Sequence, residues 1–504
     1  MAVAYATPGV YVEEVDRGTK PIEAAGASIA AFIGVTLDAT IKKSNPETGE
    51  REVVEKVLNK SVLVTNWTQF ADIFGGLSSE AYLPDAVYGY FNNGGGACYV
   101  TSIRALNETT GKQASVTIPA ANGKGKSIEV VAKTIGPSGN DLAAIVKTEG
   151  DTFSLTIAGE TQSGLTMKTI SEAKFSTAII NSSGSANPAD GTYELSGGEV
   201  PSLTANDFIG DAAERTGING LEAIDEISLI LCPDLMLGYD GSASNKELVA
   251  QVQNAMIAHC ENMQFRFAIL DTPPGLSAQA ARDWRYEVNF DTSHAALYYP
   301  WIKIADLSSP QGGSKYVPPS GHVVGIYNRS DAERGVHKAP ANEVVLGATD
   351  LELNITKGEQ GVLNKIGVNC IRSFPGRGIR VWGARTLSSD GSWRYISVRR
   401  LFNQVGSSLD TGLQWVVFEP NNHNLWAKVR RDITSFLRVI WRSGALFGTA
   451  PEAAFYVKCD EELNPPEIRD LGQLIIEVGL APVKPAEFVI LRLSQWAGAD
   501  SEAS

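Results

Sequence analysis

Arginine and aromatic side chains gather in one stretch of this acidic chain, from Gly367 to Asn403. Guanidinium groups make fixed, bidentate contacts with anionic groups, and arginine beside tryptophan or tyrosine is the usual composition of a protein–protein hot spot. The stretch therefore predicts a binding surface for an anionic ligand or a protein partner, with a solvated segment of ordinary ion pairs as the alternative. The residues are Arg372, Arg377, Arg380, Arg385, Arg394, Arg399 and Arg400, with Trp382, Trp393 and Tyr395 between them.

A second motif, Gly125-Lys126-Ser127, has the ending of a phosphate-binding loop. That loop requires a glycine five residues before Gly125, where this chain has Ala120. The following residues, 128–134, have β propensity, whereas a phosphate site needs the N-terminus of a helix at this point. We therefore expect a lysine- and glycine-containing hairpin.

Other arrangements for catalysis or metal binding are weak. The five histidines are widely separated, and the five cysteines are scattered singly, without a CxxC pair. Asp234 and Asp271 follow apolar strands, where doubly wound folds place ligand residues, but both have prolines nearby and can serve as turn residues. We expect no catalytic residue, no metal ligand and no cofactor.

The segment from His423 to Ser443 predicts a long amphipathic helix, with Asn422 as its N-cap. Apolar residues recur at three- and four-residue steps, and Lys428, Arg431, Arg438 and Arg442 line up on a different face. This basic face predicts either an electrostatic docking strip for an acidic partner or a solvated helix surface.

Composition limits the class of protein. The chain has 504 residues, a formal net charge of −14 and 43% hydrophobic residues, which predicts two to four folded domains. The acidic balance argues against non-specific nucleic-acid binding. Single, unpaired cysteines suit a reducing compartment, and no secretory signal or membrane-spanning run is present. A soluble protein made in the cytoplasm is expected.

The elements predict an α/β, multi-domain chain with mixed sheets flanked by helices. Apolar strands alternate with helices from Ile227 to Tyr299, which favours a mainly parallel sheet. Short alternating runs between Asn107 and Pro201 predict an inserted β-rich domain. The expected parts are an arm at 1–26, a core at 27–106 plus 202–360, the insert at 107–201, a C-terminal domain at 361–496 and a disordered tail at 497–504.

Further strands are expected in the C-terminal part and at both ends of the chain. In the C-terminal part they are Leu413–Phe418, Ala453–Cys459 and Gln473–Val483. The two terminal strands have no obvious partner of their own, and they either tuck onto their own subunit or extend a neighbour's sheet. These strand arms contain Pro8, Gly9, Val10, Tyr11, Val12, Glu13 and Val15 at the N-terminus, and Phe488, Val489, Ile490, Leu491 and Leu493 within Glu487–Gln495 at the C-terminus.

Several of these segments together resemble the contractile tail sheath family of phages, R-type pyocins and related injection systems. TPGVYVEEV, ASIAAFIGVT and YGYFNNGGGACYVTSIR are similar to the opening of sheath subunits. GIRVWGARTL followed by WRYISVRRLFN is similar to their C-terminal core. The resemblance covers about two-thirds of the chain and is absent from the insert, and it depends on the order of these segments rather than on any one of them.

The resemblance implies a structural subunit, not an enzyme, which polymerises in hexameric layers around an inner tail tube. Such a sheath contracts from a metastable extended state, and its terminal arms add strands to neighbouring subunits. Implied partners are the tube, baseplate and tail terminator proteins, without nucleic acid or membrane contact by the sheath itself. The implied location is the virion tail or a phage-tail-like particle, assembled in the bacterial cytoplasm. Lys428, Arg431, Arg438 and Arg442 are our candidates for the tube-facing surface.

Two other classes of function stay open at this point. An α/β enzyme would bind a phosphorylated small molecule near Asp234 and Asp271, in a polar pocket of a monomer or closed oligomer. A static tube or capsid subunit would polymerise without changing length.

Overall fold

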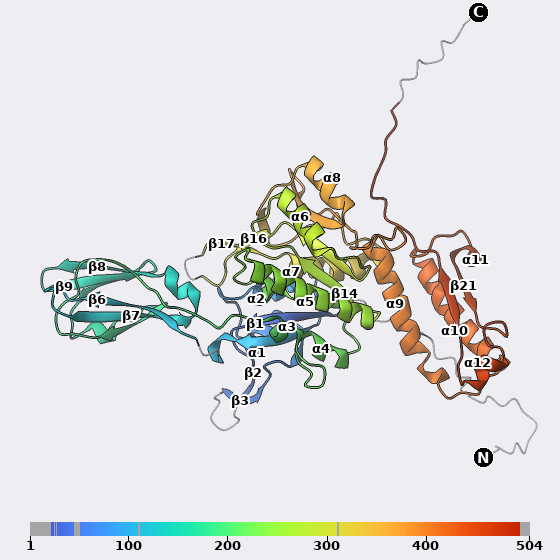
Figure 1. Ribbon diagram of the computed structural model, residues 1–504, viewed down its shortest axis with the longest axis horizontal. Helices are drawn as coiled ribbons and strands as arrows, with labels where there is room; N and C mark the ends of the chain where they lie inside the picture. The colour runs from blue at the N-terminus through green and yellow to red at the C-terminus, as the bar shows by residue number, and fades with distance from the viewer. Residues whose placement is uncertain are drawn as a thin grey trace, which may run out of the picture. The chain divides into compact units, whose positions relative to one another are not determined.

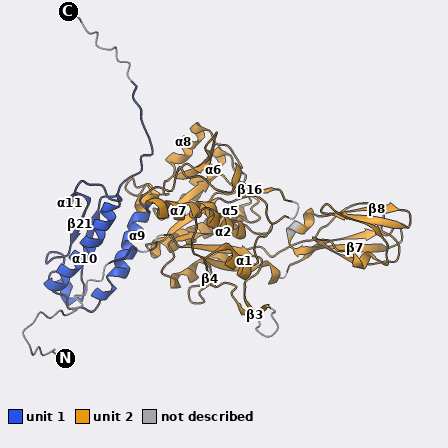
Figure 2. Cartoon of the chain, turned by 180° about the vertical axis from the view of Figure 1, so that it is seen from behind, with its two compact units in different colours: residues 1–25, 335–337, 400–504 blue, residues 26–334, 338–399 orange. Residues whose placement is uncertain are grey.

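The computed structural model describes residues 22–24, 26, 28–44, 51–108, 111–309 and 312–493. The chain divides into two compact units (Figure 2). Unit 1 contains residues 1–25, 335–337 and 400–504, and unit 2 contains residues 26–334 and 338–399. The predicted N-terminal strand arm, Pro8–Val15, and the predicted tail, 497–504, lie outside the described residues.

The central sheet of unit 2 is mixed and mostly parallel. Its strands are β1 (Ala30–Thr36), β4 (Ser61–Val64), β5 (Cys98–Ala105), β13 (Leu229–Leu231), β14 (Phe267–Asp271), β15 (Ala295–Tyr299), β19 (Val368–Phe374) and β20 (Gly378–Val381). They follow the order β20-β19-β15-β14-β13-β1-β5-β4. Figure 1 labels the strands β1 and β14 of this sheet. The run from β19 to β5 is parallel, and β20 and β4 pair antiparallel at the two edges. The predicted α/β class with mixed sheets is confirmed.

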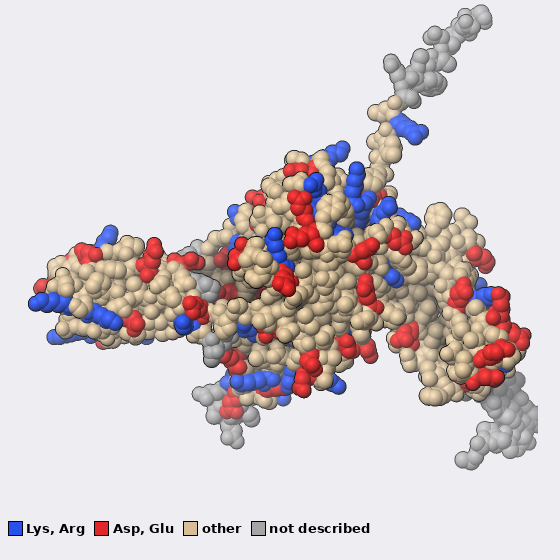
Figure 3. All heavy atoms as spheres, in the orientation of Figure 1, with Lys and Arg blue, Asp and Glu red and all other residues tan. Residues whose placement is uncertain are grey.

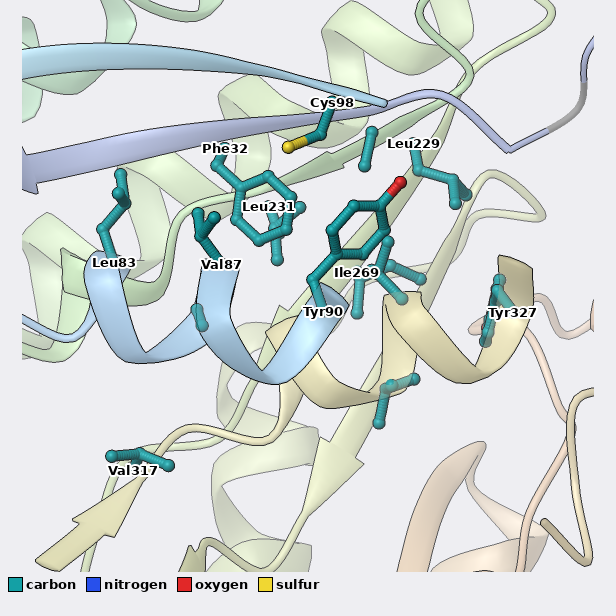
Figure 4. Close-up of a cluster of buried hydrophobic side chains, with 14 of the residues drawn as sticks. Phe32, Leu83, Val87, Tyr90, Cys98, Leu229, Leu231, Ile269, Val317 and Tyr327 are labelled. Atoms are coloured by element: carbon teal, nitrogen blue, oxygen red, sulfur yellow. The ribbon is translucent and has the colours of Figure 1, made fainter. Parts of the chain in front are cut away.

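Helices cover both faces of this sheet. They are α1 (Trp67–Phe74), α2 (Leu83–Asn92), α3 (Ala205–Ile209), α4 (Gly217–Gly220), α5 (Ala243–Asn262), α6 (Ala278–Val288), α7 (Ser320–Arg334) and α8 (Lys357–Lys365). Successive residues of a strand point to opposite faces, so β1 places Phe32 in the core under α1, α2 and α7 and Ile33 in the core under α5, α6 and α8. Figure 4 shows the first core, where Phe32 meets Tyr90 edge to face at 5.3 Å.

Helix ends follow local sequence signals. The side chain of Asn66 accepts a hydrogen bond from the Gln69 backbone N–H at 2.9 Å, so Asn66 caps the N-terminus of α1. Gly75 ends that helix in a left-handed conformation, with φ 87°, which a glycine adopts without steric cost.

The segment predicted as a β-rich insert folds into two sheets around its own apolar core. Its strands are β6 (Gln113–Pro119), β7 (Lys126–Ile135), β8 (Ala143–Glu149), β9 (Thr152–Ile157), β10 (Glu160–Leu165), β11 (Ala178–Ser182) and β12 (Gly191–Glu194). Gly125-Lys126-Ser127 lies in the antiparallel connection from β6 to β7, and the buried Ser127 hydroxyl donates to the Ala186 carbonyl at 2.6 Å. The predicted hairpin is confirmed at this motif.

Smaller elements complete unit 2. The strands are β2 (Thr40–Ser44), β3 (Arg51–Lys56), β16 (Ile302–Ala305), β17 (Ser314–Val317) and β18 (Ala348–Leu351). The short 3-10 helices are η1 (Leu106–Glu108), η2 (Pro137–Asp141), η3 (Ile170–Glu172), η4 (Leu221–Ala223) and η5 (Pro233–Met236).

Unit 1 has a helical core and a small sheet. Its elements are most of α9 (Ile396–Gly412), then η6 (Gln414–Val416), α10 (His423–Arg442), α11 (Pro451–Ala454), β21 (Phe455–Lys458), α12 (Pro466–Asp470) and β22 (Glu477–Leu480). Asn422 caps α10 as predicted, by accepting from the N–H groups of Asn424 and Leu425. The apolar stripe of α10, including Val429, Ile433 and Leu437, is buried against α9 and β21.

Among the strand predictions in this unit, Leu413–Phe418 is wrong, and Ala453–Cys459 and Gln473–Val483 are too long. The prediction for Glu487–Gln495 requires a partner strand. Leu413–Phe418 contains η6 instead of a strand, and Phe418 has φ 66° and a fully exposed side chain. Glu487–Gln495 forms no strand over its described part, 487–493, because a strand needs a partner for its backbone groups and none pairs with it in the described chain. Gln473–Val483 contains the shorter β22.

All five cysteines are reduced and buried. Cys98, Cys232, Cys260 and Cys370 lie in the two cores of unit 2, and Cys459 lies in the core of unit 1. Burial raises the pKa of each thiol above its usual value, which disfavours the thiolate. These cysteines act as packing residues.

Candidate interaction surfaces

The C-terminal segment exposes several consecutive apolar side chains, which a folded monomer normally buries. Residues 483–493 form neither helix nor strand. The exposed fractions are 72% for Phe488, 79% for Val489 and Ile490, 83% for Leu491 and 97% for Leu493. Contiguous exposed apolar side chains mark an interaction site, because water penalises their exposure.

The small sheet of unit 1 has room for additional strands. β21 pairs antiparallel with β22, from Phe455 opposite Leu480 to Lys458 opposite Glu477. Within the described residues this sheet has two strands, so each strand has a strand partner on one side only. Such an edge presents backbone N–H and C=O groups to an incoming strand.

An apolar groove of about 390 Å³ lies beside β22 in unit 1. It is lined by Leu409, Asp410, Leu413, Gln414, Val417, Ile433, Ile476 and Val478. Val417 and Phe418 are exposed nearby in the chain, at 59% and 103%. This groove is not predictable from a sequence motif, because its walls come from the separate elements α9, η6, α10 and β22.

The basic face of α10 is present on the surface as expected. Lys428, Arg431, Arg438 and Arg442 are all exposed, while the opposite stripe of the helix is buried. Arg431 forms an ion pair with the neighbouring Asp432 at 3.2 Å. The face can therefore meet an acidic surface with little loss of existing contacts.

The arginine-rich stretch separates into an outward part and a structural part. The outward part is the β19–β20 hairpin with the residue after it, where Phe374 and Trp382 lie 4.5 Å apart between their ring centres. The Arg377 guanidinium lies 5.4 Å from the Phe374 ring and 5.5 Å from the Trp382 ring, and Arg372 lies 5.1 Å from Phe374. We define the aromatic–arginine cluster as Arg372, Phe374, Arg377, Arg380 and Trp382.

The structural part contains arginines that hold the fold together. Arg399 stacks on Trp393 at 4.0 Å, and burial lowers the pKa of Arg399 to about 10. Arg385 donates to the Asn364 carbonyl at 3.1 Å, and Arg400 is buried. Only part of the stretch is therefore available to a partner, whereas the sequence presented all seven arginines alike.

Asp234 and Asp271 are structural carboxylates. Asp234 is buried and accepts hydrogen bonds from the backbone N–H groups of Val35, Tyr82 and Leu83. Asp271 is buried and accepts from the Ser320 N–H at the start of α7. Burial raises the pKa of each to about 7, against the opposing effect of these donors. They join strand ends to helices, and they do not line an open polar pocket of the kind the enzyme alternative requires.

Two kinds of site are absent from the part of the chain that the structure describes. No group of three or more His, Cys, Asp or Glu side chains there could hold a metal ion. No helix there is long and apolar enough to cross a membrane.

Comparison with protein families gives a match over the second half of the chain. Residues 218–387 match the phage tail sheath protein central domain, and residues 388–495 match the phage tail sheath C-terminal domain. Together the two domains span more than half of the chain.

Individual relatives agree with this match. The chain is 25% identical to the tail sheath protein of Burkholderia phage BcepMu over 508 residues, which cover 95% of this chain and 94% of that protein. Its fold is similar to that of the anti-feeding prophage helical sheath in the contracted state, with a TM-score of 0.60, 23% identity and coverage of 98% and 100% of the two chains. It is also similar to the PVC sheath complex of an extracellular contractile injection system in the contracted state, with a TM-score of 0.59, 23% identity and coverage of 98% and 99%. The chain therefore belongs to the phage tail sheath family, and the prediction of a structural subunit of a contractile sheath is confirmed.

Proposed function

We propose that this chain polymerises helically around an inner tube and shortens from a metastable extended state, so that the tube is driven through a target envelope. The observation that supports polymerisation most directly is the C-terminal segment with its five exposed apolar side chains. Burying one such side chain stabilises an assembly by about 1.5–3 kcal/mol. A few of them, buried together, offset the entropy that a subunit loses on joining the polymer.

The strand arms supply the connections between copies. Phe488, Val489, Ile490, Leu491 and Leu493 of one copy extend the β21–β22 sheet of a second copy, and the N-terminal residues Pro8, Gly9, Val10, Tyr11, Val12, Glu13 and Val15 extend the sheet of another. The open edges of β21 and β22 and the apolar groove beside β22 support this arrangement. Because each copy gives a strand to one neighbour and takes a strand from another, the contact is heterologous and generates an open helix.

The tube, baseplate and tail terminator proteins are the partners of the finished sheath, within a tail particle assembled in the bacterial cytoplasm. Lys428, Arg431, Arg438 and Arg442 of α10 face the tube. Charged contacts of this type steer binding and break at modest cost, which suits a surface that must release the tube during contraction. Residues 107–201 form an outer domain that stays clear of the tube.

Contraction draws its energy from interfaces and not from a nucleotide. The extended state is held by a kinetic barrier, and the contracted state has better-matched contacts between rigid units. The paired arms keep the subunits connected throughout the change.

Negative-stain microscopy of the purified chain tests this function. The expected result is striated tubes or cylinders, which disappear when residues 1–20 are removed. Uniform small particles that do not respond to this deletion would contradict polymerisation. Tubes of one fixed length under acid, urea or heat treatment would instead support a static tube subunit.

A further inference from the structure

The surface of unit 2 carries basic groups that form no ion pair with any acidic side chain that the structure describes. In the aromatic–arginine cluster, Arg372 donates to the Gln360 side chain at 2.9 Å and Arg377 donates to the Asn342 side chain at 3.0 Å. Arg380 donates to the Arg377 and Asn342 carbonyls. All these acceptors are uncharged, and none of the three arginines has an ion pair with a described residue. The three positive charges are therefore available to an outside partner.

The cluster is also held in position before any partner arrives. Gln360 of α8 accepts from Arg372 and donates to the Trp382 carbonyl at 2.8 Å, so α8 fixes both sides of the hairpin. Arg377 stacks on Phe374 and Trp382, which restricts its side chain. A rigid arginine loses less conformational entropy on binding a carboxylate than a free one. Figure 3 shows Lys and Arg side chains gathered beside α8.

Unit 1 carries a segment of the opposite charge. We define the acidic segment as Asp460–Asp470, which contains five carboxylates and one arginine, Arg469. Glu462 pairs with Lys458 at 2.7 Å, and Asp460 accepts from the Leu463 N–H. Glu461, Glu467 and Asp470 are exposed and have no ion-pair partner among the described residues. Figure 3 shows Asp and Glu side chains gathered over α12.

We propose that the aromatic–arginine cluster of one copy docks onto the acidic segment of a second copy of this chain. Three unpaired guanidiniums meet three unpaired carboxylates, and arginine forks bind carboxylates in a bidentate manner. The two surfaces are different parts of the same chain, so the contact is heterologous and can repeat along an open polymer. This inference rests on the proposed polymerisation, and it adds a side-chain interface that is separate from the strand arms.

Charge reversal tests the pairing in the full-length chain. The cluster variant carries Arg372→Glu and Arg377→Glu, and the acidic-segment variant carries Glu461→Lys and Glu467→Lys. A combined variant carries all four substitutions, and Arg377→Glu alone serves if Arg372→Glu lowers stability. A matched control reverses two charges on α10 with Lys428→Glu and Arg431→Glu. The measurement is the protein concentration at which half of the chain sediments as polymer.

Each reversal alone places like charges opposite each other, so we expect the half-assembly concentration to rise about tenfold or more. The combined variant should return to within about threefold of the wild type. The two single-surface variants should also assemble when they are mixed, because each then finds an opposite charge on the other. The α10 control should assemble within about twofold of the wild type, and its substitutions should not restore assembly to the acidic-segment variant.

The outcomes separate this proposal from the proposed function. A wild-type chain that never polymerises overturns both. Wild-type assembly by the cluster variant overturns the docking proposal alone, and so does rescue by the combined variant without rescue by mixing, because the pairing would then lie within one chain. Restored assembly of the acidic-segment variant by the α10 substitutions would also overturn it, since the effect would then come from net charge.

Discussion

The central sheet of unit 2 and the small sheet of unit 1 solve the same physical problem in different ways. Both must pair the backbone groups of their strands and cover apolar side chains. The eight-stranded sheet pairs its six inner strands on both sides within one chain, with helices over both faces and two buried cores. The β21–β22 sheet has two strands, an apolar groove beside it and an uncovered apolar segment after it.

The difference separates the part of the molecule that folds from the part that assembles. The central sheet of unit 2, which is covered by helices of its own chain, gains its stability before the chain meets a partner. The β21–β22 sheet gains part of its stability only when another chain supplies strands, so its folding and the growth of the polymer are coupled. Mutations in the two regions should consequently act on different quantities, the free energy of unfolding and the extent of assembly.

The largest effect is expected from removing a strand arm. A chain truncated after Ala486 lacks Phe488 and the apolar residues that follow, and it should form no sedimenting polymer at concentrations where the wild type assembles fully. The thermal midpoint of unit 2 should stay within about 2 °C, because the segment is exposed and no core depends on it. Sedimentation and circular dichroism measure the two quantities, and normal tubes from the truncated chain would contradict the role of the arm.

A pair of phenylalanines tests the same comparison at single-residue scale. Phe32 is fully buried and Phe488 is 72% exposed. Phe32→Ala should lower the free energy of unfolding by about 3–5 kcal/mol, because it leaves a cavity in a packed core. Phe488→Ala should change it by less than about 0.5 kcal/mol and should reduce assembly instead. Urea denaturation checks both values, and similar losses of stability in the two variants would remove the distinction.

The buried carboxylates Asp234 and Asp271 make the stability of unit 2 depend on pH. Burial raises the pKa of Asp271 from its ordinary 3.8 to about 7, so the folded chain retains a proton that the unfolded chain releases between these values. Stability from this group is complete below about pH 4 and falls as pH rises through 7, by at most about 1.4 kcal/mol per unit.

Asp271→Asn keeps an acceptor for the Ser320 N–H and removes the titration. Its unfolding free energy should therefore depend less steeply on pH between 4 and 7 than that of the wild type. Denaturation curves at several pH values measure the slope, and parallel slopes in the two proteins would show that Asp271 does not titrate in this range.

The smallest effect on the isolated chain is expected on α10. Lys428→Glu with Arg438→Glu changes exposed charges, so unfolding should shift by less than about 0.5 kcal/mol and tube-free polymerisation by less than about twofold. Co-assembly with purified tube should be lost, as microscopy of sheath–tube particles would reveal. Unchanged co-assembly would place the tube contact on another surface.

Local signals in the sequence were enough to predict the elements that fold by themselves. Asn422 caps α10 as predicted, and the predicted apolar stripe of that helix is buried, because caps and periodicity act over a few residues. The hairpin at Gly125-Lys126-Ser127 was predictable because the glycine and helix of a phosphate loop are missing there.

The interaction surfaces were less predictable, because they depend on contacts between distant residues. The apolar run Leu413–Phe418 looks like a strand, but it leads into the exposed turn at Phe418. Glu487–Gln495 has the composition of a strand without a partner in the described chain. The groove needs Leu409, Ile433 and Val478 from separate elements, and the stacking of Arg377 on Trp382 needs the hairpin to close first.

The buried cysteines have a consequence for the life of the particle after it leaves the cell. A tail particle works outside the cytoplasm, where oxidants convert accessible thiols into disulfides and sulfenic acids. Here every thiol lies in a core, and burial keeps it in the unreactive protonated form. Burial thus protects these thiols from oxidation, so we expect no disulfide cross-links between copies to obstruct the movement of the sheath.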